Sequence, residues 1–291
     1  MKDNTKDIIN NLTIVLVLFR STKDILKLLD EIKNFRILIV DNGGNKDILL
    51  KIKSLNLNVD ILGKNKNLGY GRAINLAYQY IKTPYFLILN PDLLITYENI
   101  QKLYNTIILN KNCAITAPIT KPDYDFYGTF PEKENILKNK YEQSISKKLY
   151  NADIEGLCCV DVVKGCAMLV NRNLFNEVGK FDEKYFLFYE EIDLCKKIKK
   201  KNYSIVLCND SLANHKTSSS SKDDYITLFI KSYHIEKSTM IYFNKNKLSF
   251  AQIWKLTKYI FRTFTYLLIL NVKKSLINFA KFFAIINYML K

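Results

Sequence analysis

The chain has 291 residues, with 44 Lys and Arg against 28 Asp and Glu, and therefore a formal net charge of +16. Apolar residues make up 48% of it and Gly and Pro are scarce, which excludes disordered and fibrous proteins and indicates a folded protein of enzyme size. The six cysteines form no CxxC pair, and the opening run MKDNTKDIIN lacks the apolar core of a signal peptide. We therefore expect a cytosolic protein whose cysteines are reduced and serve as small buried residues.

Strands and helices alternate along the first ninety residues. An unbroken apolar run at 12–19 predicts a buried strand, and the spacing of apolar residues over 22–33 predicts a helix that covers it. The same unit recurs, with strands expected at 36–41, 58–62 and 85–90 and helices at 46–54 and 70–81. This alternation is typical of a parallel, doubly wound α/β sheet.

The rhythm is lost between about residues 119 and 160, where aromatic, Pro, Lys and Glu residues gather. We interpret this stretch as a surface insert. Regular structure is expected to return as a strand within 160–171, a short helix ending at Val178, a helix over 190–201 and a last core strand over 203–208.

Polar residues follow three of the predicted strands. Asp41 ends one strand, the run NKNLGYGR (65–72) follows the next, and Asn90 and Asp92 follow the third. Because ligands of open α/β sheets bind beyond the carboxyl ends of the strands, we expect these residues to line one crevice. The first strand is followed by FRSTKD, and no GxxxxGK[ST] run occurs, which argues against a classical dinucleotide site or a P-loop.

Two of these strand ends offer contacts for a nucleotide. The Asp41 carboxylate could accept hydrogen bonds from a base or a ribose, although an Asp before Asn-Gly-Gly also suits a plain turn. Gly69 would let the backbone approach a ligand and Arg72 offers a fork of donors to a diphosphate, although an ordinary helix entry has the same pattern.

The third strand end offers ligands for a metal. Asp92 and Asn90 carry hard oxygen atoms that suit a divalent cation bridging two phosphates, although Asn-Pro-Asp is also a common helix-entry turn. His215, one of two histidines, lies after the last predicted strand and could complete such a site with Asp92; the alternative is an unligated loop histidine.

An acidic helix start follows an aromatic block in the run FDEKYFLFYEEID (181–193). Aromatic surroundings exclude water and can raise a carboxyl pKa into the range of a general base. Glu190 and Asp193 are three residues apart and share a helix face, whereas Glu191 points about 100° away, so the three cannot do the same work. Acidic residues that complement the helix dipole are the alternative.

The C-terminal part is basic throughout: residues 237–291 hold ten Lys and Arg and no Asp or Glu. Its longest uncharged stretch, 263–272, is about half of the ~20 residues that a spanning helix needs. We therefore expect amphipathic helices that lie on an anionic membrane surface, with basic side chains at the headgroups (Lys255, Lys258, Arg262) and aromatic ones toward the acyl chains (Trp254, Phe261, Phe264). The alternative is packing on the folded body or a second subunit. A nucleic-acid partner is not expected, because the positive charge is concentrated in this tail.

Taken in order, the runs VDNGGN, NKNLGYGRAIN, LILNPD, KGCAMLVNRNLFNEVGKFDEKYFLFYEEIDLC and HKTSSSS resemble the inverting family 2 glycosyltransferases with a GT-A fold. They are most similar to the rhamnosyltransferase-like branch that builds bacterial surface polysaccharides. The resemblance spans about residues 12–245 and implies a Rossmann-like, mostly parallel sheet with flanking helices. It implies a catalytic domain at 1–245, with a nucleotide half over about 1–118 and an acceptor half over about 119–245, and a membrane-associating tail at 246–291.

The resemblance also implies roles for the residues at the strand ends. Asp41 would contact the nucleobase, and Asn67, Gly69 and Arg72 would border the nucleotide. Arg20 stands where the family often has Asn, which puts the identity of the donor in question.

For the metal, the resemblance implies that Asp92, with Asn90 beside it, holds Mg²⁺ or Mn²⁺ on the diphosphate. His215 would be a further metal or phosphate contact. Glu191 falls at the position of the family's general base; because this position more often holds Asp, Glu190 or Asp193 could share the role.

The implied reaction is a single displacement that inverts the anomeric carbon of a nucleotide sugar. The expected donor is dTDP-rhamnose and the expected acceptor a lipid-linked oligosaccharide at the inner face of the membrane. Two alternatives remain: the same fold with UDP-galactose, galactofuranose or N-acetylglucosamine as donor sugar, and a non-catalytic basic protein that binds membranes or nucleic acid.

Overall fold

The computed structural model describes residues 3–21, 24–63, 66–121, 130, 157–215, 224–243 and 250–290. Most of the expected surface insert, together with Asn65 and the serine run 218–221, lies outside these residues. The chain forms two compact units: Met1–Asp182 with Glu191–Ser220, and Glu183–Glu190 with Ser221–Lys291. Each unit is described by itself below.

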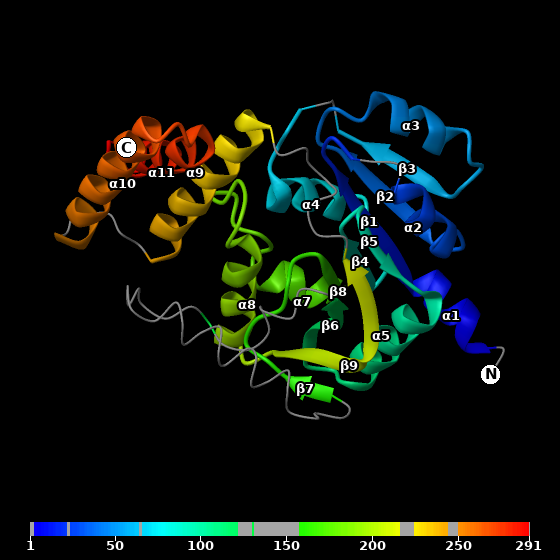
Figure 1. Ribbon diagram of the computed structural model, residues 1–291. Coiled ribbons are helices and arrows are strands. Elements are labelled where there is room, and N and C mark those ends of the chain that lie inside the picture. The colour runs from blue at the N-terminus through cyan, green and yellow to red at the C-terminus, as the bar shows by residue number, and fades with distance from the viewer. Residues whose placement is uncertain are drawn as a thin grey trace. The chain divides into compact units, whose positions relative to one another are not determined.

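The first unit begins with the expected parallel sheet, whose strands run in the order β3-β2-β1-β4. The strands are β1 (Leu12–Leu18), β2 (Arg36–Asp41), β3 (Val59–Leu62) and β4 (Tyr85–Leu89). They alternate with α2 (Ile25–Glu31), α3 (Lys46–Lys53) and α4 (Tyr70–Tyr78), while α1 (Asp3–Asn11) precedes β1. Every residue of β1 is buried, which explains its unbroken apolar run. Because the strands are parallel, their carboxyl ends meet at one edge of the sheet (Figure 1).

The sheet continues from β4 through β8, β6 and β9 to β5, and most of these added pairs are antiparallel. These strands are β5 (Leu93–Ile95), β6 (Cys113–Lys121), β7 (Leu157–Cys159), β8 (Ala167–Asn171) and β9 (Ser204–His215). The accompanying helices are α5 (Tyr97–Leu109), α7 (Arg172–Glu177) and α8 (Glu190–Lys200). The α/β class with flanking helices is confirmed, and the antiparallel strands complete it.

Strand β9 is longer than the sequence indicates, and this changes the position of His215. The expected strand stops at 208, but β9 continues to His215 across a register shift, in which Pro118 pairs with Cys208 and Ile119 with Leu212. A polar bulge therefore interrupts the apolar pattern without ending the strand. The expectation that His215 lies in a loop is wrong; it is the last residue of a paired strand.

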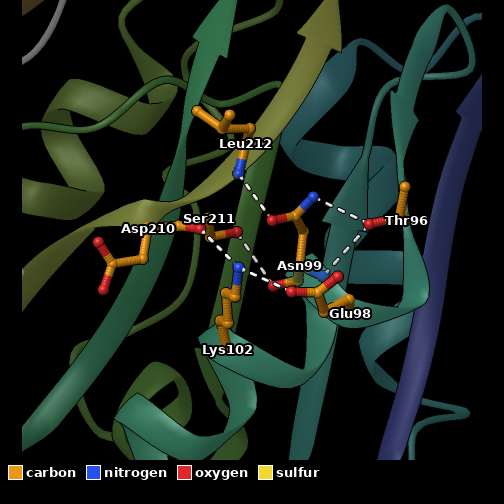
Figure 2. A network of polar contacts seen from close by, with 7 residues as sticks. All are labelled: Thr96, Glu98, Asn99, Lys102, Asp210, Ser211 and Leu212. Carbon is orange, nitrogen blue, oxygen red and sulfur yellow. Dashed lines mark hydrogen bonds and ion pairs between the residues drawn. The ribbon is translucent and has the colours of Figure 1, made fainter.

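Asn99 on α5 anchors the bulged part of β9 (Figure 2). Its Oδ1 accepts a hydrogen bond from the Leu212 backbone N–H at 3.0 Å, and its Nδ2 donates to the Thr96 hydroxyl at 2.9 Å. The Asn99 carbonyl accepts from the Ser211 hydroxyl at 3.0 Å. Thr96 is the N-cap of α5, so the start of this helix and the strand that ends at His215 are held together.

Lys102 adds a second anchor one turn along α5. Its ammonium donates to the Asp210 backbone carbonyl at 3.1 Å and pairs with Glu98 at 3.0 Å (Figure 2). Both side chains of this ion pair are exposed, so we expect the pair itself to contribute at most about 0.5 kcal/mol.

The second unit contains α9 (Tyr225–Tyr242), α10 (Phe250–Leu268) and α11 (Val272–Met289), with α11 packed against both other helices. Met240, Tyr259 and Ile285 form its small core. Within the described part of the chain, no helix combines the length and the apolar character needed to cross a membrane.

A buried carboxylate ties α9 to α10. Glu236 accepts hydrogen bonds from the Lys255 ammonium and the Tyr259 hydroxyl, both at 3.0 Å. The Lys255 side chain is only 13% exposed. The expectation that Lys255 points to the headgroups with Lys258 and Arg262 is therefore wrong, because a buried carboxylate needs a partner of opposite charge.

Asn99→Ala should lower the free energy of unfolding by about 1 kcal/mol, since it removes the bond to Leu212 and part of the α5 cap. Asn176→Ala is the matched control, because Asn176 is exposed and its side chain makes no hydrogen bond to the described residues. Urea unfolding followed by circular dichroism measures both. Equal stability of the two variants would show that Asn99 does not anchor β9.

Candidate active site

The loop after β2 is built around the Asn45 side chain. Its Nδ2 donates to the Leu18 carbonyl at 2.8 Å and to Asp41 Oδ1 at 2.7 Å, and its Oδ1 accepts from the Ser21 N–H at 2.9 Å. Asp41 Oδ1 also accepts from the Gly43 N–H at 3.0 Å. The ends of β1 and β2 are therefore fixed to each other, and Asp41 is held in one orientation.

Asp41 also lines an open pocket of about 250 Å³ beside α3. The other lining residues are two lysines and two leucines (Lys46, Lys53, Leu49, Leu50). Among the described residues, hydrogen-bond donors reach only Oδ1 of Asp41, so Oδ2 is available to a ligand. This carboxylate can therefore accept a bond from the N–H or hydroxyl group of a base or ribose.

Asn42 brings the segment before α4 to the same edge. Its Oδ1 accepts from the Leu68 N–H at 2.9 Å, and its Nδ2 donates to Asn67 Oδ1 at 3.2 Å and to the Gly69 carbonyl at 3.1 Å. Gly69 has φ +87° and forms the N-cap of α4, a conformation that favours glycine. Asn67 and Gly69 thus lie beside the Asp41 loop, as the sequence predicts, and Arg72 is exposed on the first turn of α4.

Tyr70, the first residue of α4, joins this edge to the loop before β8. Its hydroxyl donates to the Gly165 carbonyl at 2.5 Å and lies 3.3 Å from Asn90 Oδ1. The Asn90 N–H donates to the Cys166 carbonyl at 2.8 Å. The end of β4 and residues 165–166 are therefore bound together through one side chain and one backbone bond.

Asp92 and His215 lie side by side because Leu93 of β5 pairs with His215 of β9. His215 Nε2 is 3.4 Å from Asp92 Oδ1, with side chains 16% and 5% exposed. A carboxylate oxygen is the donor that Mg²⁺ and Mn²⁺ prefer, and an imidazole nitrogen is a donor for transition-metal ions, so the pair suits Mn²⁺ better than Mg²⁺. No cluster of three or more His, Cys, Asp and Glu residues occurs in the described ranges, so a substrate or water would have to supply the other ligands. The pair fits an ion shared with a diphosphate.

Glu191 packs against Gly165 from the first turn of α8. A Cβ atom built on Gly165 would lie 3.4 Å from the Glu191 Cβ and 3.6 Å from the Tyr70 ring. A Cβ at 165 would therefore be in van der Waals contact with both side chains, which shows how closely this loop packs against them. Burial raises the pKa of the Glu191 carboxyl above its ordinary value, which strengthens it as a proton acceptor.

Cys166 lies in the loop between the end of β4 and Glu191, and its carbonyl accepts from the Asn90 N–H. Burial raises the pKa of its thiol to about 12, and the negative charges of Asp92 and Glu191 both add to this rise. Asp92 and Glu191 are 99 positions apart in the chain, yet residues 165–166 contact both Glu191 and Asn90, which lies two residues before Asp92. The two carboxylates that the sequence singled out for metal binding and for proton transfer therefore flank the same loop.

The other two acids of α8 have different surroundings. Asp193 lies 3.0 Å from the Lys197 ammonium on the same helix, so its charge is neutralised locally. Glu190 is buried and belongs to the second unit. Of the three candidates for a general base, only Glu191 is shown to contact the Gly165 loop.

Sequence reasoning gave no role to the residues that connect the site. Asn42 and Asn45 organise the Asp41 loop, while Tyr70, Gly165 and Cys166 join Asn90 to Glu191. Tyr70 and Gly165 occur in the motif-like runs NLGYGR and KGCAMLV, but nothing in their spacing indicates that they meet.

Curated relatives cover about two thirds of the chain. A low-salt glycan biosynthesis hexosyltransferase, Agl10 of Haloferax volcanii, is 27% identical over 218 residues, or 71% of this chain and 68% of its own. An N-acetylglucosaminyl-diphospho-decaprenol L-rhamnosyltransferase of Mycobacterium tuberculosis is 22% identical over 64% of this chain and 68% of its own. A dTDP-rhamnosyl transferase, RfbF of Shigella flexneri, is 25% identical over 68% and 66%.

Solved structures share the fold at low identity. A mannosyltransferase from Pyrobaculum calidifontis, in complex with GDP-Man and Mn²⁺, has a TM-score of 0.56 at 11% identity and covers 96% of this chain and 73% of its own. GalNAc-T7 with UDP, GalNAc and Mn²⁺ has a TM-score of 0.57 at 13% identity over 79% of this chain, and the match spans about half (51%) of that structure.

The sequence profile described as Glycosyl transferase family 2 matches residues 2–178, which is more than half of the chain. With the strand order and these neighbours, it confirms the GT-A fold. The chain therefore belongs to glycosyl transferase family 2, and it is a glycosyltransferase of the rhamnosyltransferase-like branch.

Proposed function

We propose that this glycosyltransferase moves rhamnose from dTDP-rhamnose to a lipid-linked oligosaccharide, with inversion and with the help of Mg²⁺ or Mn²⁺. The observation that carries the proposal is the set of contacts that residues 165–166 make with Asn90, two residues before Asp92, and with Glu191, which supports a metal ligand and a base at one site. In this proposal the nucleotide half is about 1–118 and the acceptor half about 119–245. The protein works at the inner face of the membrane, where the lipid-linked acceptor is held.

Asp92 and His215 would hold the ion, with Asn90 beside them. When bound, the ion supplies positive charge for the diphosphate that leaves. The donor's base would contact Asp41, and its phosphates would lie near Asn67, Gly69 and Arg72. The N–H groups at the start of α4 suit an anion, because the helix dipole favours negative charge there.

Glu191 would act as the general base. Its carboxylate accepts the proton of an acceptor hydroxyl while that oxygen bonds to the anomeric carbon and the bond from this carbon to the diphosphate oxygen breaks. Burial favours this role because a carboxylate with a raised pKa binds the proton more strongly. Tyr70 does not take part in the proton transfer; its hydroxyl is bonded to the Gly165 carbonyl and so positions the loop against which Glu191 packs.

Rhamnose is supported by the names of relatives, two of which are described as a dTDP-rhamnosyl transferase and a diphospho-decaprenol L-rhamnosyltransferase. The decaprenol acceptor named for the latter supports a lipid-linked acceptor for this chain. Arg20, whose backbone N–H bonds to the Gly43 carbonyl at 3.0 Å, stands beside the Asp41 loop and is a candidate to influence the choice of donor.

Glu191→Gln should reduce sugar transfer about 10²- to 10⁴-fold, because the amide cannot accept the proton. The pKa of Glu191 is raised above 4.5 and the base must be ionised, so the kcat/KM of the wild type should rise with pH along a limb placed above pH 4.5. A raised folded-state pKa also means that ionised Glu191 costs stability above that pKa, so the Gln variant should melt at the same or a higher temperature at about pH 8.

Asp193→Asn is the control for this experiment, because its carboxylate is paired with Lys197. We expect it to lose little activity. If the Glu191→Gln variant transfers sugar nearly as fast as the wild type, Glu191 is not the base. If the variant melts at a lower temperature and its loss of activity only matches its loss of folded protein, the assignment is also contradicted.

Asp92→Asn should weaken Mn²⁺ binding at least about tenfold, since a charged ligand is replaced by a neutral one. Isothermal titration of Mn²⁺ in the presence of dTDP measures the affinity without turnover. Asp60→Asn is the matched control, because Asp60 is an exposed carboxylate paired with Arg36 at 3.1 Å. An unchanged affinity in the Asp92 variant, or an equal loss in the control, would exclude Asp92 as a ligand.

A panel of nucleotide sugars tests the donor. We expect dTDP-rhamnose with Mn²⁺ to release dTDP fastest in the presence of a polyprenyl diphosphate-linked acceptor, because the transition state is stabilised only with the matching sugar. UDP-galactose, UDP-galactofuranose and UDP-N-acetylglucosamine are the competing donors. If one of these three releases its nucleotide faster than dTDP-rhamnose does, that sugar nucleotide is the donor and rhamnose is excluded. If no donor supports transfer, the proposed reaction is contradicted.

A further inference from the structure

One side of α10 carries a stripe of exposed large apolar residues. Trp254 is 57% exposed, Phe261 69%, Phe264 59% and Leu268 82%. Their spacing of seven, three and four residues places them on one helix face. The opposite face includes Tyr259, which is 9% exposed and belongs to the core of the second unit. The packing of the three helices therefore leaves this stripe uncovered.

The turn between α10 and α11 continues the apolar surface. Ile269 is 68% exposed and Leu270 84%, although turns of globular proteins are usually polar. Asn271 is the exception, and its side chain caps α11 by accepting from the Lys274 N–H at 3.1 Å. We call the stripe and the turn the apolar ridge; its residues are Trp254, Phe261, Phe264, Leu267, Leu268, Ile269, Leu270 and Val272. A group of large exposed apolar side chains of this kind indicates an interaction site.

Cations lie next to the ridge, and acids are absent from the sequence between residues 237 and 291. Arg262 is exposed on α10, and Lys273 and Lys274 are exposed at the start of α11. Partial burial lowers the pKa of Lys258, and the positive charges of neighbouring cations, first Arg262, lower it further. The ridge thus combines apolar side chains with a positive border.

The combination of apolar and positively charged side chains favours a membrane over a second copy of the chain as the partner of the ridge. A second copy of the chain would bring the same cations to the interface, and like charges across an interface are repulsive. A bilayer with anionic lipids offers both an apolar interior and negative headgroups, which complement the ridge and its border. Trp254 is also the only tryptophan of the chain, and this residue type prefers the membrane interface.

We propose that the apolar ridge inserts into the surface of an anionic phospholipid bilayer, with Lys258, Arg262, Lys273 and Lys274 at the headgroups. The structure changes in two ways the set of residues that the sequence places at the membrane. The exposed turn at 269–270 is added to the inserted surface. Lys255 no longer belongs with the headgroup cations, because its side chain is buried and paired with Glu236. The inference rests on the proposed function only in that a lipid-linked acceptor needs an enzyme at the membrane.

The single tryptophan makes insertion directly measurable in the full-length protein. Vesicles of phosphatidylcholine with about 30% phosphatidylglycerol should shift the Trp254 emission to shorter wavelength. Brominated acyl chains should quench that emission. Vesicles of phosphatidylcholine alone should bind more weakly, and salt should weaken the anionic binding. No shift and no quenching with anionic vesicles would overturn the proposal.

Variants test which residues insert. The double variant Leu268→Glu, Leu270→Glu should reduce the vesicle-bound fraction in sedimentation at least about tenfold, since buried charge opposes insertion. Leu109→Glu is the matched control, because Leu109 is 80% exposed on the first unit, close to the 82% of Leu268. Circular dichroism checks that all variants are folded. Equal binding by the double variant and the control would contradict insertion of the ridge.

Two further readouts distinguish membrane insertion from self-association and from loss of catalysis. If wild-type protein is a dimer by light scattering, fails to bind vesicles, and becomes a monomer in the double variant, the ridge is a contact between copies and the proposal fails. Glu191→Gln should bind vesicles as the wild type does, and the double variant should still release dTDP when offered a short, soluble acceptor. Loss of membrane binding and loss of chemistry are thereby distinguishable.

Discussion

The hydrogen bond from the Tyr70 hydroxyl to the Gly165 carbonyl is the constraint on which the site depends. It connects the start of α4 to the loop before β8, and the missing side chain at Gly165 lets Glu191 approach the same place. The φ of Gly165 is not in the left-handed region, and a Cβ there would meet Glu191 and Tyr70 at 3.4 and 3.6 Å, so the position is one of close packing and not of backbone strain.

The strand order explains why Asp92 is buried next to a histidine. The chain leaves the centre of the sheet at β4 and re-enters it at β5, on the far side of β8, β6 and β9. Asp92 lies on this short crossing, and the pairing of Leu93 with His215 brings the imidazole to it. The Asn99 network holds β9 in that register despite its bulge (Figure 2). The proposed pair of metal ligands thus arises next to an edge strand of only three residues.

The two units differ in which charged side chains they bury and which they expose. The first unit keeps Asp41 and Asp92 buried at strand ends, where carboxylates suit base, ribose and metal contacts. The second unit neutralises its buried carboxylate, Glu236, with Lys255 and leaves its other cations around an exposed apolar ridge. Much of the net positive charge of the sequence thus lies around the ridge that we propose to insert into an anionic bilayer, while the proposed reaction site depends on negative groups.

The sequence by itself determined the elements whose side-chain spacing is local: β1 to β4, the helices between them, and the polar residues Asp41, Asn90 and Asp92 at their ends. It also indicated the family through the ordered motifs. Only the tertiary structure decided that β8, β5 and β7 pair antiparallel, that His215 is a strand residue beside Asp92, and that Glu191 faces Gly165. The physical reason is that periodicity reports which face of an element is buried, whereas contacts between residues a hundred positions apart are set by how whole elements pack.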